Sequence, residues 1–128
     1  MLGASSDTSQ NGGVTVDWSW ASSGFILPNA GDTLTLSAGD VTIFTVTYTA
    51  SWPISPGAAA NLDDTFLTAA DAADGSRWCA ASSSLSGGDK GSPSAVNDNC
   101  TNIDHDGDGY SVDAGDCDDD DSLSLIHI

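Results

Sequence analysis

The sequence predicts an all-β domain followed by a helix-less acidic loop. Three observations predict it: segments that alternate hydrophobic and polar residues, turn residues between these segments, and Asp as the only acidic residue type. Short segments alternate hydrophobic and polar residues, as half-buried strands do. Gly, Asn, Asp and Pro separate these segments and are typical of turns. All 19 acidic residues are Asp, whereas surface helices commonly use Glu. Short strands joined by turns favour an antiparallel sandwich or barrel.

Three segments carry the strand pattern. Residues 14–20 and 33–36 alternate, and residues 41–49 are rich in β-branched and aromatic side chains. We expect residues 21–32 to form a loop and residues 38–40 to turn the chain between the second and third strands. The expected core residues of the first and third strands are Val14, Val16, Trp18, Trp20, Val41, Ile43, Phe44, Val46 and Tyr48.

The chain after these strands is expected to be less regular. Residues 64–73 are expected to contain a helical turn capped by Asp64. Trp78 is the expected core anchor near the end of the domain. Residues 82–99 are rich in Ser, Gly, Asn and Asp and are expected to form an ordered connector. The domain boundary is placed near Cys100.

The segments FILPNAGDTLTL, WPISPGAAANLD, SRWCAA and GDKGSPSAVND follow one another in the order typical of a known family. Residues 2–98 resemble the later two-thirds of a bacterial lamin-tail domain, with Ser94 where Gly is usual. The resemblance implies an immunoglobulin-like β-sandwich. The opening strands of the family have no counterpart here, so residues 1–99 are expected to be an incomplete sandwich and the chain a fragment.

The charge of the chain limits its partners. The formal net charge is −17, and Arg77 and Lys90 are the only Lys or Arg residues. Such a chain repels nucleic acid and anionic lipid, so neither is an expected partner. No segment approaches the ~18 apolar residues that a membrane-spanning helix needs. We therefore expect no membrane insertion.

Nine of the 19 Asp residues lie between positions 104 and 121. This segment begins DHDGDG, the D-x-D-x-D-G start of a calcium loop. Carboxylates at alternate positions converge on one ion when the chain curls, and Gly109 at the sixth position permits the turn. The predicted ligands are Asp104, Asp106, Asp108 and the backbone carbonyl of Tyr110. The simpler interpretation is a solvated acidic tail, but Ile103, Tyr110 and Val112 interrupt the acids at loop-like intervals.

The end of this loop departs from an EF-hand. Its twelfth position is Gly115, which offers no carboxylate, and no flanking helix is expected. We expect Asp116 or Asp119 to close the site, with Asp113 acting through water. His105 alternates with the ligands and is expected to point outward, away from the ion.

The pattern DxDGDGY…GDCDD resembles the metal-binding repeat of methanotroph copper-binding surface proteins and is similar to thrombospondin type-3 calcium repeats. The resemblance covers residues 104–121 and implies that the ligands are Asp104, Asp106, Asp108, Asp116, Asp118 and Asp119. Calcium is the expected ion because the ligands are oxygens. Copper is the alternative, but copper favours imidazole or sulfur, and His105 is the only such group within the acid triad.

Three cysteines in a chain with so few basic residues fit an oxidising compartment, and none has a CxxC spacing. A disulfide between Cys79 and Cys100 would close the connector, and this pairing is favoured. The competing pairing, Cys100 with Cys117, would close the acidic loop with a disulfide. No secretion signal is visible after Met1, so an exported protein would carry its signal outside this sequence.

No arrangement of residues typical of catalysis is found: there is no G-x-S-x-G elbow, phosphate loop or HExxH motif. We therefore expect a non-catalytic secreted or cell-surface module that binds calcium and has a structural or adhesive role, with extracellular proteins or cell-surface components as partners. The alternatives are a copper-binding surface protein and an accessory domain of a secreted hydrolase. Residues 100–121 form the metal-binding repeat. Residues 122–128 resemble translated sequencing-adapter read-through and are assigned no function.

Overall fold

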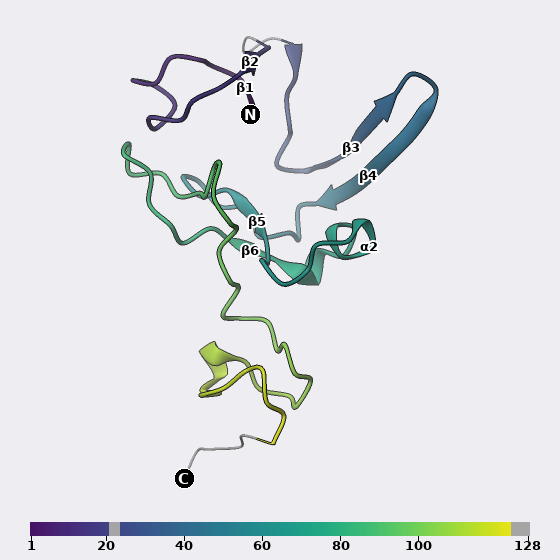
Figure 1. Cartoon of the computed structure of the whole chain (residues 1–128), viewed down its shortest axis with the longest axis vertical. Coiled ribbons are helices and arrows are strands. Elements are labelled where there is room, and N and C mark those ends of the chain that lie inside the picture. The colour runs from purple at the N-terminus through teal and green to yellow at the C-terminus, as the bar shows by residue number, and fades with distance from the viewer. Residues whose placement is uncertain (21–23, 124–128) are drawn as a thin grey trace.

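The structure is a computed structural model that describes residues 1–20 and 24–123 (Figure 1). Their strands form three two-stranded sheets, β1–β2, β3–β4 and β5–β6. The strands are β1 (Leu2–Gly3), β2 (Trp18–Ser19), β3 (Gly31–Ala38), β4 (Val41–Thr49), β5 (Ala60–Leu62) and β6 (Trp78–Ala80), and the helical turns are α2 (Ala69–Ala72), η1 (Gly75–Arg77) and η2 (Val112–Ala114). The β-rich fold is confirmed, whereas the immunoglobulin-like sandwich stays a prediction.

Two predicted segments lie partly outside the described residues. The loop expected over residues 21–32 includes residues 21–23, and the tail over residues 122–128 includes residues 124–128. Within the described part of the chain, no helix is long and apolar enough to cross a membrane.

The β3–β4 hairpin is the most regular part of the fold. β4 has the bounds predicted for the third strand, and β3 extends the predicted segment at both ends. Gly39 turns the chain between them at φ 57°, a left-handed conformation that glycine adopts easily. Leu34 pairs with Val46 and Leu36 with Phe44, so one face of the hairpin is apolar.

The core prediction was wrong for Val41 and Ile43, which are 66% and 60% exposed. The register shifts between Leu36, which pairs with Phe44, and Ser37, which pairs with Thr42, so Ile43 has no partner on β3. Such an irregularity interrupts the alternation of side chains between the two faces of a strand. The prediction counted apolar residues along β4 and did not foresee this interruption.

The first predicted strand is shorter than expected. Of residues 14–20, only Trp18 and Ser19 form a strand, β2, which pairs in parallel with β1. The side-chain amide of Asn11 explains the loss, because it accepts from the Val14 N–H at 3.0 Å and donates to the Val14 carbonyl at 2.9 Å. The backbone of Val14 is therefore already bonded and cannot join a sheet ladder. Trp18 is 59% exposed rather than buried.

An aromatic cluster beside β4 forms the small core. Val46 is 6% exposed. The rings of Trp52 and Trp78 lie 5.2 Å apart, and those of Tyr48 and Trp52 lie 6.3 Å apart. The Trp78 indole donates to the Ala72 carbonyl at 3.2 Å, which ties α2 to the cluster. Trp78 therefore anchors this region, although it is half-buried and not deep in a core.

The helical turn begins later than predicted. Thr68, not Asp64, caps α2: its hydroxyl accepts from the Asp71 N–H, and the Asp71 carboxylate accepts from the Thr68 N–H. These two reciprocal hydrogen bonds satisfy the backbone N–H groups of Thr68 and Asp71. Asp64 instead accepts from the side chain of Asn99 at 3.4 Å.

The β5–β6 pair holds the connector that follows it. A disulfide joins Cys79 of β6 to Cys100, which confirms the favoured pairing, and Cys117 lies outside this bond. Asn61 of β5 is buried, donates to the Asp98 carbonyl at 2.8 Å and accepts from the Asp98 N–H at 3.1 Å. Figure 1 shows the segment after Cys100 continuing beyond β5–β6, away from the β3–β4 hairpin.

Gly75→Ala should destabilise the aromatic cluster. An added Cβ would lie 2.5 Å from the Trp52 indole nitrogen, closer than a real Cβ contact allows. The packed ring would have to shift, at a cost of about 1–3 kcal/mol in the free energy of unfolding. Gly87→Ala is the matched control, because its added Cβ meets only ordinary contact at 3.7 Å. Urea unfolding of both variants tests this, and equal stabilities would contradict it.

Asp98 should make the stability of the connector pH-dependent. Hydrogen bonds from the Ser83 hydroxyl and from the backbone amides of Ser83 and Ser82 lower the pKa of Asp98 to about 2. Because this is below the usual value of ~3.9, the stabilisation is complete above about pH 5 and is lost as the pH falls through about 2. The stability difference between wild type and Asp98→Asn should shrink between about pH 6 and about pH 3. A constant difference would show that these hydrogen bonds contribute nothing.

Candidate metal centre

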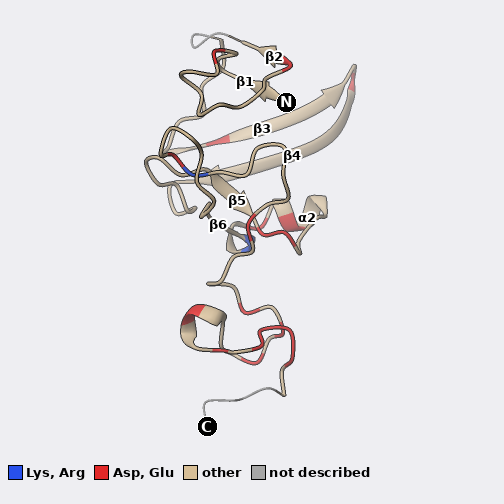
Figure 2. Cartoon of the chain, turned by 60° about the vertical axis from the view of Figure 1, so that its left-hand side comes forward, with Lys and Arg blue, Asp and Glu red and all other residues tan. Residues whose placement is uncertain are grey.

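The acidic segment folds into a compact loop below the β5–β6 pair, and most of the aspartates there lie close together (Figure 2). Ile103 is 6% exposed and gives the loop an apolar anchor. The Asp113 N–H donates to the Thr101 carbonyl at 2.9 Å, which closes the loop on itself. Gly115, the twelfth residue of the loop, ends η2 in a left-handed conformation at φ 101°.

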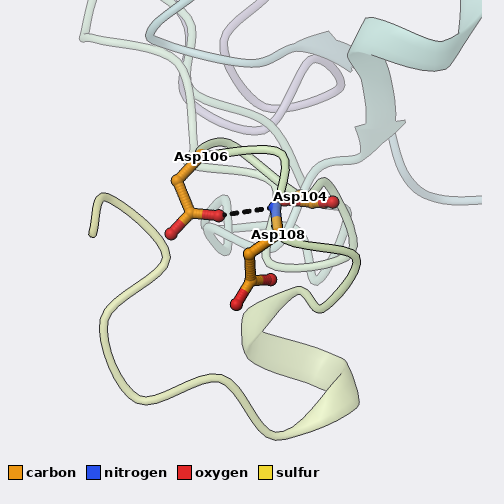
Figure 3. Close-up of side chains that lie close together, drawn as sticks. All are labelled: Asp104, Asp106 and Asp108. Carbon is orange, nitrogen blue, oxygen red and sulfur yellow. Dashed lines mark hydrogen bonds between the residues drawn. The ribbon is translucent and has the colours of Figure 1, made fainter. Parts of the chain in front are cut away.

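A first group of carboxylates consists of Asp104, Asp106 and Asp108 (Figure 3). One oxygen from each lies within 4.8 Å of the others. The Asp104 carboxylate accepts from the N–H groups of Gly107 and Gly109 at 2.7 and 2.9 Å. Gly109 has φ 100°, a conformation that a side chain would strain. The turn predicted at the sixth position is therefore present.

A second group consists of Asp106, Asp116 and Asp119, again with one oxygen from each within 4.8 Å of the others. Asp116 and Asp119 are 6% and 8% exposed. The Oδ2 atoms of Asp106 and Asp116 are buried and have no hydrogen-bond partner among the residues that the structure describes. Buried carboxylate oxygens without partners are costly. The chemistry of this donor set, three converging oxygens, fits a hard cation.

Electrostatic strain is concentrated on Asp106, which belongs to both groups. Burial raises the pKa of Asp106, and the negative charges of Asp108, Asp116 and Asp104 raise it further against an opposing hydrogen bond from the Asp108 N–H. Burial favours the protonated form of this carboxyl, whereas the repulsion from the neighbouring carboxylates is a cost that a bound cation would also reduce.

The expectation that His105 points outward was wrong. Its side chain is 8% exposed. Nδ1 lies 2.6 Å from Asp119 Oδ2, and Nε2 lies 3.2 Å from Asp63 Oδ1. The ring stacks on Phe66 with the ring planes 7° apart. Alternation within the loop missed this because the partners Asp63 and Phe66 lie some 40 residues earlier in the chain.

The two carboxylates keep the imidazole of His105 in place. Burial lowers the pKa of His105, but the contacts with Asp119 and Asp63 outweigh burial and raise it above its usual value. The pKa of Asp63 is lowered: burial opposes ionisation, while hydrogen bonds from Thr65 and the Cys100 N–H, together with His105, favour it. Asp63 was not predicted as a site residue, although the Asp-x-Thr spacing to Thr65 is a signal for the turn it forms.

Two further predicted ligands, Asp113 and Asp118, are exposed and are not gathered into either carboxylate group. The role of the Tyr110 backbone carbonyl stays a prediction. Asp113 lies in η2, and the Asp118 N–H donates to Asp116 Oδ1 at 2.9 Å. The structure therefore brings together Asp104, Asp106 and Asp108 at the start of the loop, and Asp106, Asp116 and Asp119 across it.

No family model, curated protein or solved structure matches this chain.

Asp116→Asn should stabilise the loop when metal is removed by a chelator. The substitution removes one buried negative charge from a cluster of three, an expected gain of about 1 kcal/mol, or about fivefold slower local opening. Chymotrypsin cleavage after Tyr110 measures that opening. Asp120→Asn is the control, because it removes the same charge from an exposed position outside both groups. Equal effects of the two substitutions would show that the buried charge of Asp116 costs no more than the exposed charge of Asp120.

Proposed function

We propose that this chain is a non-catalytic calcium-binding module of a secreted or cell-surface protein, with a structural or adhesive role. The observation that supports this best is the convergence of Asp106, Asp116 and Asp119, of which Asp116 and Asp119 are buried. Asp106 and Asp116 each carry a buried oxygen that has no hydrogen-bond partner among the described residues. A cation would supply the missing partner. The ordering of an acidic loop by that cation would then stiffen the module.

Calcium is preferred to copper because of the donor atoms. Both carboxylate groups offer only oxygens, the ligands that Ca²⁺ takes in irregular geometry. Copper favours imidazole nitrogen or sulfur. Each ring nitrogen of His105 already faces a carboxylate oxygen, Nδ1 that of Asp119 and Nε2 that of Asp63, so neither is directed at the space between the three carboxylates.

The extracellular location and the partial domain belong to the same proposal. The Cys79–Cys100 disulfide supports an oxidising compartment. The exposed apolar side chains of Leu36, Val41 and Ile43 on the β3–β4 hairpin support an immunoglobulin-like sandwich, because a second sheet would cover such side chains. Both features agree with the resemblance to a partial bacterial lamin-tail domain followed by a metal-binding repeat.

Calcium titration of the whole chain by calorimetry tests the proposal. We expect saturable binding at ~10⁻⁴–10⁻³ M, the range of extracellular modules. Asp106→Asn should weaken binding about tenfold or more, because Asp106 belongs to both carboxylate groups.

Asp120→Asn is the matched control for charge and should leave the affinity nearly unchanged. Absence of binding at millimolar Ca²⁺ would refute the proposal. Equal weakening by both substitutions would show that the loop only attracts ions diffusely.

A further inference from the structure

One buried side chain connects the acidic loop to the rest of the protein. His105 lies between Asp119, a member of the second carboxylate group, and Asp63, which is 0% exposed and follows β5 directly. Asp63 Oδ2 also accepts from the Cys100 N–H at 2.6 Å, next to the disulfide. A continuous set of contacts therefore runs from the carboxylate group to the β5–β6 pair.

We propose that His105 is a positioning residue that couples cation binding in the acidic loop to the stability of the β5–β6 pair and the disulfide-linked segment at Cys100. The inference rests on the proposed function, since it concerns the same carboxylates. His105 would contact no ion. It would act through Asp119 on one side and through Asp63 on the other.

On the loop side, His105 holds both oxygens of one ligand. The His105 N–H donates to Asp119 Oδ1 at 3.2 Å, and Nδ1 lies 2.6 Å from Oδ2. Each carboxylate oxygen has two lone pairs, so both oxygens keep one for a cation. His105 thus orients Asp119 without using up its ligand capacity, as outer partners of metal ligands commonly do.

On the domain side, His105 Nε2 is buried 3.2 Å from Asp63 Oδ1. Nε2 makes no hydrogen bond to any described residue, so this contact is an ion pair that ring packing supports. The ring of His105 stacks on the ring of Phe66. The Arg77 guanidinium also lies over the Phe66 ring, 4.0 Å from its centre. The Asp63 carboxylate cannot lose His105 without exposing a buried charge to an incomplete set of partners. When a cation orders Asp119, the ring of His105 is held against Asp63, and the opening of the Cys100 amide becomes less favourable.

Binding and stability must then be coupled in both directions, because coupling free energies are reciprocal. A cation protects the Cys100 region, and an intact Asp63 contact strengthens cation binding. Asp63→Asn should accordingly weaken Ca²⁺ binding about fivefold, although Asp63 belongs to neither carboxylate group.

Three substitutions of His105 separate its two contacts. His105→Asn keeps a donor near the position of Nδ1, facing Asp119, and His105→Gln keeps one near the position of Nε2, facing Asp63. His105→Ala removes both. His105→Asn should therefore weaken Ca²⁺ binding about fivefold, as Asp63→Asn does, because only the contact with Asp63 is lost, whereas His105→Gln and His105→Ala should lose about tenfold or more because Asp119 is no longer oriented.

The test is amide hydrogen exchange of the whole disulfide-bonded chain by NMR, with and without Ca²⁺, beside calorimetry of the same samples. In the wild type, Ca²⁺ should slow exchange of the Cys100 amide about fivefold or more and leave the β3–β4 hairpin amides unchanged. In all three His105 variants the slowing should disappear, including in His105→Asn, which still binds Ca²⁺.

The outcomes are distinguishable. Equal slowing at Cys100 in wild type and His105→Asn would overturn the coupling role. Ca²⁺ binding to the wild type without any change at Cys100 would also overturn it, and would leave the proposed function standing. No Ca²⁺ binding to the wild type would refute the proposed function and this inference together.

Discussion

The buried carboxylate of Asp63 holds together the end of β5, the segment at Cys100 and the acidic loop. No Lys or Arg side chain is among the contacts of this carboxylate with the described residues. Asp63 is 0% exposed, and burying an ionised carboxylate costs several kcal/mol unless its oxygens are satisfied. Its partners come from three separate parts of the chain: Thr65 in the adjacent turn, the Cys100 amide beside the disulfide, and His105 in the acidic loop. These segments must therefore remain together for Asp63 to remain ionised and buried.

Patterns that depend on neighbouring residues were predictable from the sequence. Strand β4 and the turn at Gly39 follow from β-branched alternation and from glycine, and the gathering of Asp104, Asp106 and Asp108 follows from their spacing. The disulfide partner of Cys79 was favoured because Cys79 and Cys100 flank one connector. These features are local or depend on the closure of one loop. The spacing of hydrophobic, turn and acidic residues along the sequence is therefore enough to predict them.

Patterns that depend on distant contacts were not predictable in the same way. His105 looked like a spacer between ligands, because nothing in the loop reveals Asp63 and Phe66 as its partners. Val14 looked like a strand residue, because the side chain of Asn11 competes for its backbone in a way that alternation ignores. Thr68 and not Asp64 is the N-cap of α2, because its reciprocal hydrogen bonds with Asp71 satisfy two backbone N–H groups at once. In each case a specific hydrogen bond or ion pair outweighed a general preference.

A crystal structure grown with Ca²⁺ tests most directly whether the loop's buried carboxylates form a calcium site beside His105. We predict anomalous density at about 2.3–2.6 Å from oxygens of Asp106, Asp116 and Asp119, with the His105 ring still between Asp119 and Asp63. Density bound by a His105 nitrogen, or a loop that contains no ion at saturating Ca²⁺, would contradict the account.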